Sequence, residues 1–323
     1  MRWLALVLLV AVPAGAGTSD TLRTINQRAE AERLARSIAD GAPLNQALNR
    51  IHFLGQEHVA AVLLGQSFAT LPSIERRRDV MQALAELRDP ESGPLMLSGV
   101  GDPDTAVRLW AATGAGRLRL VAAGPALAGL LVETSPGLRR EAARALGLLR
   151  QPKYGAVLAR AAAAEGDPEV RAVMLVACGQ CGDRRQVPAL EAYLAQSSES
   201  ARQAAAQGLV LLGASQGFAY AKARLASSDR YERLAALALF EGVGAKAAAP
   251  LVAPLLDDDD RRLAAQAARV LYDGGDRTKL EWLVLQSYQA QGEARLPYEE
   301  VLERLRLTDE QRAAILRQKG IVR

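Results

Sequence analysis

The chain has 323 residues, a formal net charge of +4, 4% aromatic residues, two histidines and two cysteines. Basic residues alternate with acidic ones, so the sequence lacks the basic stripe and the stacking aromatics of a nucleic-acid-binding protein. With so few histidines and cysteines, we expect neither a metal site nor a cofactor.

The first sixteen residues have the pattern of a secretory signal peptide. Arg2 precedes an apolar run from Leu4 to Val12, and Ala14-Gly15-Ala16 forms an A-x-A cleavage site. We expect cleavage after Ala16 and export to the periplasm or the medium. The alternative is a membrane anchor, but a spanning helix needs about 20 residues, so we expect no transmembrane segment in the mature chain.

Residues 17–70 are predicted to form an N-terminal helical cap. Helices are expected over 20–39, 43–54 and 57–69, and they do not share the spacing of the segment that follows. Gln46 stands where the arginine column described next would continue. Terminal repeats are atypical because one face meets water, so this segment is interpreted as degenerate repeats.

Between residues 71 and 291, an arginine recurs every 31 or 32 residues. A Ser or Asp stands four residues before each arginine, where a short side-chain oxygen can cap a helix N-terminus. Apolar residues follow at offsets of 3, 7 and 10, which lie on one helical face. The arginine column is Arg77, Arg108, Arg139, Arg171, Arg202 and Arg233, with Arg261 or Arg262 as a seventh member, and the caps are Ser73, Asp104, Ser135, Asp167, Ser198, Asp229 and Asp257 or Asp258.

Another helix is predicted before each of these, so the repeat is a helix pair. Such helices are expected over 152–165, 186–196, 216–226 and 246–256, with Pro188 and Pro250 near helix starts and Pro254 as the site of a kink. A lone pair cannot bury its apolar face, whereas stacked pairs can. The predicted fold is all-α, a curved or superhelical α-solenoid of stacked antiparallel helix pairs.

Four segments carry a resemblance to a known family: 102–112, 135–149, 167–183 and 199–213, of which DPEVRAVMLVACGQCGD is the clearest. They resemble HEAT repeats, in the short variety also found in phycobilisome-lyase-like proteins. The resemblance implies the fold, but the family hosts scaffolds, enzymes and chaperones. Its metal-dependent hydroxylases use His-Glu pairs, and neither His52 nor His58 is followed by Glu.

Residues 292–323 depart from the repeat and are predicted to form a C-terminal helical cap. A helix over 279–291 precedes a break, a helix over 297–305 and a last helix capped by Thr308. A swapped or dimer-forming tail is the alternative, and the oligomeric state is left open. The acidic run Asp257–Asp260 is interpreted as a helix cap, since it lacks the ligand spacing of a calcium loop.

Two groups of residues in the repeats have a structural and a functional interpretation. The arginine column is expected to contact cap residues of the adjacent repeat and to set its register, so that Arg171→Ala would lower stability; the alternative is partner binding. Cys178 and Cys181 occupy core columns. They are interpreted as core residues, as a local disulfide, or as a redox pair.

The concave face is expected to carry the positions one, two and five residues after each arginine. From these we select as partner-binding candidates Leu109, Trp110, Arg140, Glu141, Arg144, Gln203 and Gln207. Trp and Arg often anchor interfaces, although Trp110 could equally pack between repeats.

The sequence favours a non-enzymatic protein-binding or scaffold protein of the cell envelope or secretome. Its partner would be a protein or peptide held along the concave face. The alternative, which the resemblance implies, is a lyase-like or ligand-carrying protein that handles a bulky small molecule. No phosphate loop and no G-x-S-x-G elbow occurs in the sequence.

Overall fold

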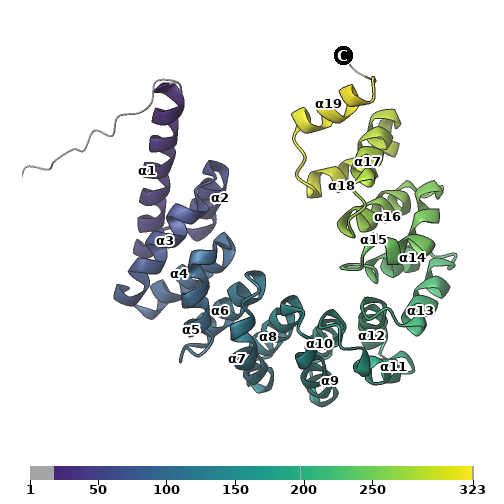
Figure 1. Ribbon diagram of the computed structural model, residues 1–323, viewed down its shortest axis with the longest axis horizontal. Coiled ribbons are helices and arrows are strands. Elements are labelled where there is room, and N and C mark those ends of the chain that lie inside the picture. The colour runs from purple at the N-terminus through teal and green to yellow at the C-terminus, as the bar shows by residue number, and fades with distance from the viewer. Residues whose placement is uncertain (1–17, 197, 322–323) are drawn as a thin grey trace, which may run out of the picture. The chain divides into compact units, whose positions relative to one another are not determined.

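The computed structural model describes residues 18–196 and 198–321, and the predicted signal peptide over 1–16 lies outside them. Within these residues the chain forms nineteen α-helices and eight short 3₁₀ helices, with no strand (Figure 1). The all-α prediction is confirmed. None of the described helices is both long enough and apolar enough to cross a membrane.

The chain divides into two compact units, residues 1–118 and 119–323. In the first, α1 packs on α2 and α3, and α4 lies against α6, whose outer partner is α5. The helices of this unit are α1 (Thr18–Asp40), α2 (Leu44–Leu54), α3 (Glu57–Ser67), α4 (Ile74–Leu87), α5 (Gly93–Gly99) and α6 (Thr105–Arg117).

In the second unit, α10 packs between α8 and α12, and the shorter helices α7, α9 and α11 each pack on the next one in the chain (Figure 1). This is a stack of helix pairs, as predicted. The helices are α7 (Gly124–Gly129), α8 (Pro136–Leu149), α9 (Gly155–Ala164), α10 (Pro168–Gln180), α11 (Val187–Leu194), α12 (Glu199–Leu211), α13 (Ser215–Leu225), α14 (Arg230–Ala238), α15 (Ala245–Val252), α16 (Arg261–Asp273), α17 (Thr278–Gln289), α18 (Leu296–Arg304) and α19 (Asp309–Gln318).

The second helix of each of the first six repeats begins where the cap residues predicted. Each Ser or Asp side chain accepts a hydrogen bond from a backbone N–H of the first turn, which would otherwise lack a partner. Pro136 and Pro168 follow their caps directly, where a missing N–H costs little.

The seventh repeat differs from the prediction. Asp260 caps α16 and accepts from the Arg262 N–H at 2.9 Å, so neither Asp257 nor Asp258 is the cap. The residue four positions on is Ala264, 31 residues after Arg233, and the arginine column therefore ends at Arg233. Neither Arg261 nor Arg262 belongs to it.

The prolines before α16 explain the shift. Pro254 was expected to kink a continuous helix, but the α-helix ends at Val252 and a 3₁₀ helix over Ala253–Asp257 replaces its last turn. Proline removes a backbone donor and crowds the preceding turn, which favours this break. Pro250 was expected near the start of its helix and instead lies inside α15.

The last helices cover the end of the stack. Leu302 is buried with Ala265 and Ala268 of α16, and Leu305, Ile315 and Leu316 pack around this cluster. Thr308 caps α19 in a reciprocal capping box with Gln311. These contacts agree with the predicted C-terminal cap.

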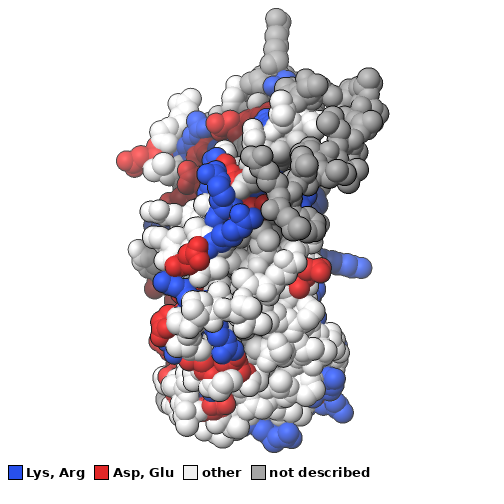
Figure 2. Space-filling view, turned by 90° about the vertical axis from the view of Figure 1, so that its left-hand side faces the viewer, with Lys and Arg blue, Asp and Glu red and all other residues white. Residues whose placement is uncertain are grey.

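Charged side chains of both signs cover the surface. On the face shown in Figure 2, Lys and Arg side chains lie among Asp and Glu side chains, and no continuous basic stripe forms. Asp258 and Asp260 of the acidic run face arginines, at 2.6 Å from Arg233 and 3.4 Å from Arg230.

Candidate functional site

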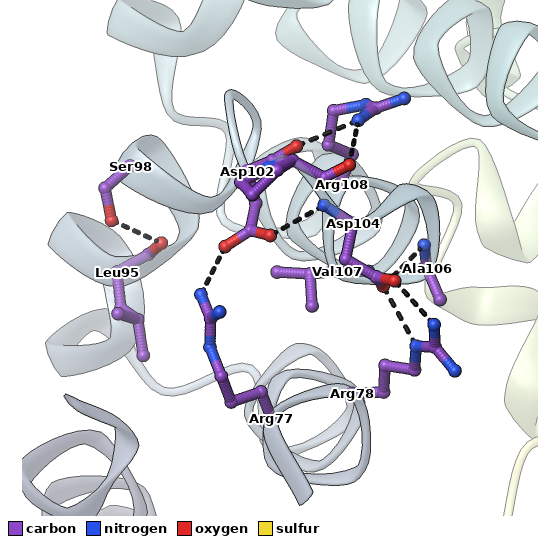
Figure 3. Close-up of polar contacts among 10 residues, drawn as sticks. Arg77, Arg78, Leu95, Ser98, Asp102, Asp104, Ala106, Val107 and Arg108 are labelled. Atoms are coloured by element: carbon purple, nitrogen blue, oxygen red, sulfur yellow. Dashed lines mark hydrogen bonds and ion pairs between the residues drawn. The ribbon is translucent and has the colours of Figure 1, made fainter. Parts of the chain in front are cut away.

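The arginine column contacts an acid that lies two residues before the predicted cap (Figure 3). Arg77 donates to Asp102 at 2.5 Å, and the other oxygen of Asp102 accepts the backbone N–H of Asp104 at 2.9 Å. Arg108, the next arginine of the column, donates to the carbonyl oxygen of Asp102 at 2.9 Å. Asp102 therefore joins the arginines of two successive repeats.

The cap residue Asp104 has a different partner from the one predicted. It pairs with Arg78, which follows the column arginine, at 2.6 and 3.0 Å. This hydrogen-bonded guanidinium lowers the pKa of Asp104 to about 2. Asp104 therefore fixes the start of α6 and holds α4 beside it.

The same arrangement recurs around Glu165 in the second unit. Arg139 donates to both carboxylate oxygens at 2.7 and 2.8 Å, and Asp167 donates its N–H at 2.9 Å. Arg171 donates to the carbonyl oxygen of Glu165. The side chains of Arg139 and Glu165 are 16% and 4% exposed, so this pair is nearly withdrawn from water.

Sequence reasoning missed this acid column, although its signal is readable. The acid stands 25 or 26 residues after the preceding arginine: Asp102 follows Arg77, Glu165 follows Arg139 and Asp258 follows Arg233. In two repeats the position holds Gln196 and Ser227, so those junctions lack the carboxylate.

A pocket of about 370 Å³ lies on α8, α10, α12 and the end of α14 in the second unit. Most of its lining residues stand at the predicted offsets of one, two and five after the arginines, but none of the six column arginines lines it. The lining consists of Arg144, Ala172, Val173, Val176, Ala177, Gln180, Ser200, Gln203, Ala204, Gln207, Ala238 and Leu239.

Three of the selected partner-binding candidates therefore come together: Arg144, Gln203 and Gln207. Ala177, Gln180 and Ser200 also line the pocket and were missed. They lie at offsets of six, nine and minus two, positions that a helical-wheel projection of the same face would have included.

Small residues create the hollow. A Cβ atom built on Gly179 of α10 would lie 2.4 Å from the Gly208 Cα atom of α12, so only glycine allows this approach. The most buried lining residues near this contact are Ala177 and Ala204. Their methyl groups form a shallow apolar floor, which larger side chains would fill.

The polar groups of the pocket are available to a ligand. The Arg144 side chain is 55% exposed, and its nearest carboxylate is that of Glu141 at 3.4 Å. Among the described residues, the side-chain amides of Gln180, Gln203 and Gln207 make no hydrogen bond with the protein. An amide both donates and accepts, so these groups suit a peptide backbone.

The remaining candidates lie outside the pocket lining. Leu109 and Trp110 are half-buried on α6 in the first unit, so Trp110 retains both of its interpretations. Arg140 is exposed on α8, one turn before Arg144, and Glu141 lies between them.

The two cysteines are free and buried, with exposed fractions of 0% for Cys178 and 1% for Cys181. The Cys178 Sγ lies 3.5 Å from the Gly155 carbonyl oxygen, and the Cys181 Sγ lies 3.7 Å from that of Leu146. Burial raises the pKa of each thiol to about 12. Redox chemistry proceeds through the thiolate, and this environment opposes its formation.

We expect the folded protein to leave both thiols unlabelled by a thiol reagent at pH 8, because they are buried and protonated. After unfolding without reductant, both should react. Thiol titration of folded and unfolded protein checks this. No reactive thiol in the unfolded sample would establish a disulfide, and rapid labelling of the folded protein would contradict their burial.

Comparison with known proteins agrees with this geometry. Residues 62–146 and 129–210 match the sequence pattern of HEAT repeats. The protein contains HEAT repeats. Among curated protein sequences, none matches the chain.

Solved structures with a similar fold include the complex of CpcE and CpcF of phycocyanin lyase from Nostoc. One of its chains is 18% identical, with a TM-score of 0.51 over 76% of this chain and 94% of that chain. Human deoxyhypusine hydroxylase is also 18% identical, with a TM-score of 0.33 over 76% of this chain and 96% of that one. At this identity the likeness concerns the fold of the HEAT repeats.

Proposed function

We propose that this HEAT-repeat protein is an exported, non-enzymatic binding protein that holds a peptide segment of a protein partner in the pocket on α8, α10 and α12. The pocket carries the proposal: its volume of about 370 Å³ and its apolar floor with unpaired amides suit recognition of a chain segment. Its lining residues include no carboxylate, imidazole or thiol that could serve as an acid, base or nucleophile. Export is supported by the pattern of residues 1–16.

Capture of partners from a cell-envelope fraction tests the proposal. We expect the wild-type protein to retain a stoichiometric partner and Ala172→Trp to lose it, because the indole would occupy the pocket. Ala163→Trp, at an exposed position on α9, is the matched control and should retain the partner. Both variants are compared at equal melting temperature.

Undiminished capture by Ala172→Trp would contradict the assignment of the pocket. The intact mass of the protein from the same fraction tests export, since a mass that includes Met1 would contradict signal-peptide cleavage. Trp110→Ala, tested in parallel, reports whether the first unit contributes to binding.

A bulky small molecule is the second candidate ligand. The pocket volume of about 370 Å³ lies within the range of small-molecule sites, and a chain of a phycocyanin lyase shares the fold. An absorbing compound that copurifies with wild-type protein, but not with Ala172→Trp, would favour it over a peptide.

A further inference from the structure

We propose that the peptide held in this pocket combines an acidic residue, which faces α8, with a bulky apolar residue, which fills the recess between α10 and α12. The inference rests on the proposed function and specifies the chemistry of the partner. It also predicts the direction in which the segment lies across the helices.

Charge on the pocket surface is confined to one end. On α8 the outward positions are Arg140, Glu141 and Arg144, whereas the equivalent positions on α10, α12 and α14 are all uncharged. Arg140 has no ion-pair partner among the described residues, and Arg144 approaches Glu141 only at 3.4 Å. An anionic group beside α8 would therefore gain charge-assisted hydrogen bonds without displacing a strong pair.

The lining also disfavours the opposite charge. It contains no Asp or Glu, so a lysine or arginine of the partner would enter the pocket without a counterion and beside Arg144. Juxtaposition of like charges lowers both affinity and association rate. The pocket should thus discriminate between acidic and basic segments, which otherwise have the same backbone.

The apolar recess lies next to this charge. Val173 and Val176 of α10 border the methyl floor formed by Ala177 and Ala204. An apolar side chain placed there leaves water at about 25 cal/mol per Å² of buried area, so larger branched or aromatic side chains bind better. Gln203 and Gln207 stand one turn apart on α12 and can bond the backbone on either side.

Helix packing sets the spacing between the two residues. Packed helices lie about 8–10 Å apart, and an extended chain advances about 3.3 Å per residue. Since α10 packs directly between α8 and α12, the step from Arg144 to the recess spans about three or four residues of peptide. The segment should therefore carry its carboxylate three or four positions from its bulky apolar residue.

Selection from a random nonapeptide library displayed on phage, with the mature protein as bait, tests the inference. We expect enrichment of peptides with Asp or Glu three or four positions from Leu, Phe or another bulky apolar residue. The best peptide, labelled with fluorescein, should bind about tenfold more weakly to Arg144→Glu, because attraction becomes repulsion. Arg160→Glu, an exposed site on α9, is the charge-matched control and should change affinity less than twofold.

The outcomes separate the inference from the proposed function. Enrichment of apolar or basic peptides with no acidic preference, or equal losses in Arg144→Glu and Arg160→Glu, would overturn the inference while the pocket remained a binding site. If no peptide is enriched, or if Ala172→Trp binds the selected peptide as well as the wild type does, both the inference and the proposed function fail.

Discussion

Replacement of Arg139 by alanine is expected to lower the free energy of unfolding by about 3 kcal/mol. The substitution would leave the carboxylate of Glu165, whose side chain is 4% exposed, without its bidentate partner. It would also remove hydrogen bonds of 2.7 and 3.1 Å to the carbonyl oxygens of Glu133 and Thr134. Breaking one side of a nearly buried pair costs far more than losing a surface ion pair.

Arg140→Ala is the matched control, because Arg140 is the adjacent arginine on the same helix but is exposed. We expect it to change stability by less than about 0.5 kcal/mol. Urea unfolding followed by circular dichroism gives both values. Equal effects of the two substitutions would contradict a structural role for the arginine column.

The effect of Arg139→Ala should also depend on pH. The hydrogen bond from Arg139 holds the pKa of Glu165 below its ordinary value of 4.5. A lowered folded-state pKa stabilises the protein above the unfolded-state pKa, and this stabilisation is lost as the pH falls through the folded-state value. The difference between wild type and variant should therefore be full at neutral pH and shrink on acidification.

Gly179→Ala is expected to destabilise the second unit by about 2 kcal/mol. The new Cβ atom would lie 2.4 Å from the Gly208 Cα atom and 2.5 Å from its carbonyl oxygen, and backbone atoms can yield only if α10 and α12 move apart. Because Ala177 and Ala204 lie on these two helices, separation would also disrupt the pocket floor. Peptide binding should weaken together with stability.

Gly65→Ala in α3 is the control, since nothing lies within 4 Å of its Cβ position. There alanine should stabilise the helix by about 0.5–1 kcal/mol, because glycine is the poorer helix former. Thermal unfolding of the two variants should therefore give shifts of opposite sign. A stabilising Gly179→Ala would show that α10 and α12 are not held in close contact.

These two predictions concern complementary ways of joining repeats. Carboxylates at Asp102, Glu165 and Asp258 link some repeats through the arginine column. At Gln196 and Ser227 the carboxylate is missing, and the glycine contact between α10 and α12 adjoins this part of the stack. The pocket therefore lies where the stack depends more on close helix packing than on ion pairs.

Much of the fold could be predicted because helix caps are local. Asp104 and Asp167 act within one turn of their own helix, so sequence alone located them. Asp260 was missed because the break at Pro254 changed the spacing before α16, and only the 31-residue step from Arg233 to Ala264 preserves the period.

Long-range pairing was harder to predict. Glu165 lies in a connecting segment whose column varies between Asp, Glu, Gln and Ser, so no single residue type marks it. Arg144, Gln203 and Gln207 were identified as surface candidates by periodicity, but their convergence on one pocket depends on the contact between Gly179 and Gly208. That contact joins two repeats at unequal offsets, which a one-repeat pattern does not contain.

Hydrogen–deuterium exchange of the mature protein, with and without its captured partner or a selected peptide, tests the central claim most directly. The pocket assignment predicts that ligand binding slows exchange in α8, α10 and α12, and that Ala172→Trp abolishes this protection. Protection confined to α6 around Trp110, or to the outer helices α9 and α11, would contradict it.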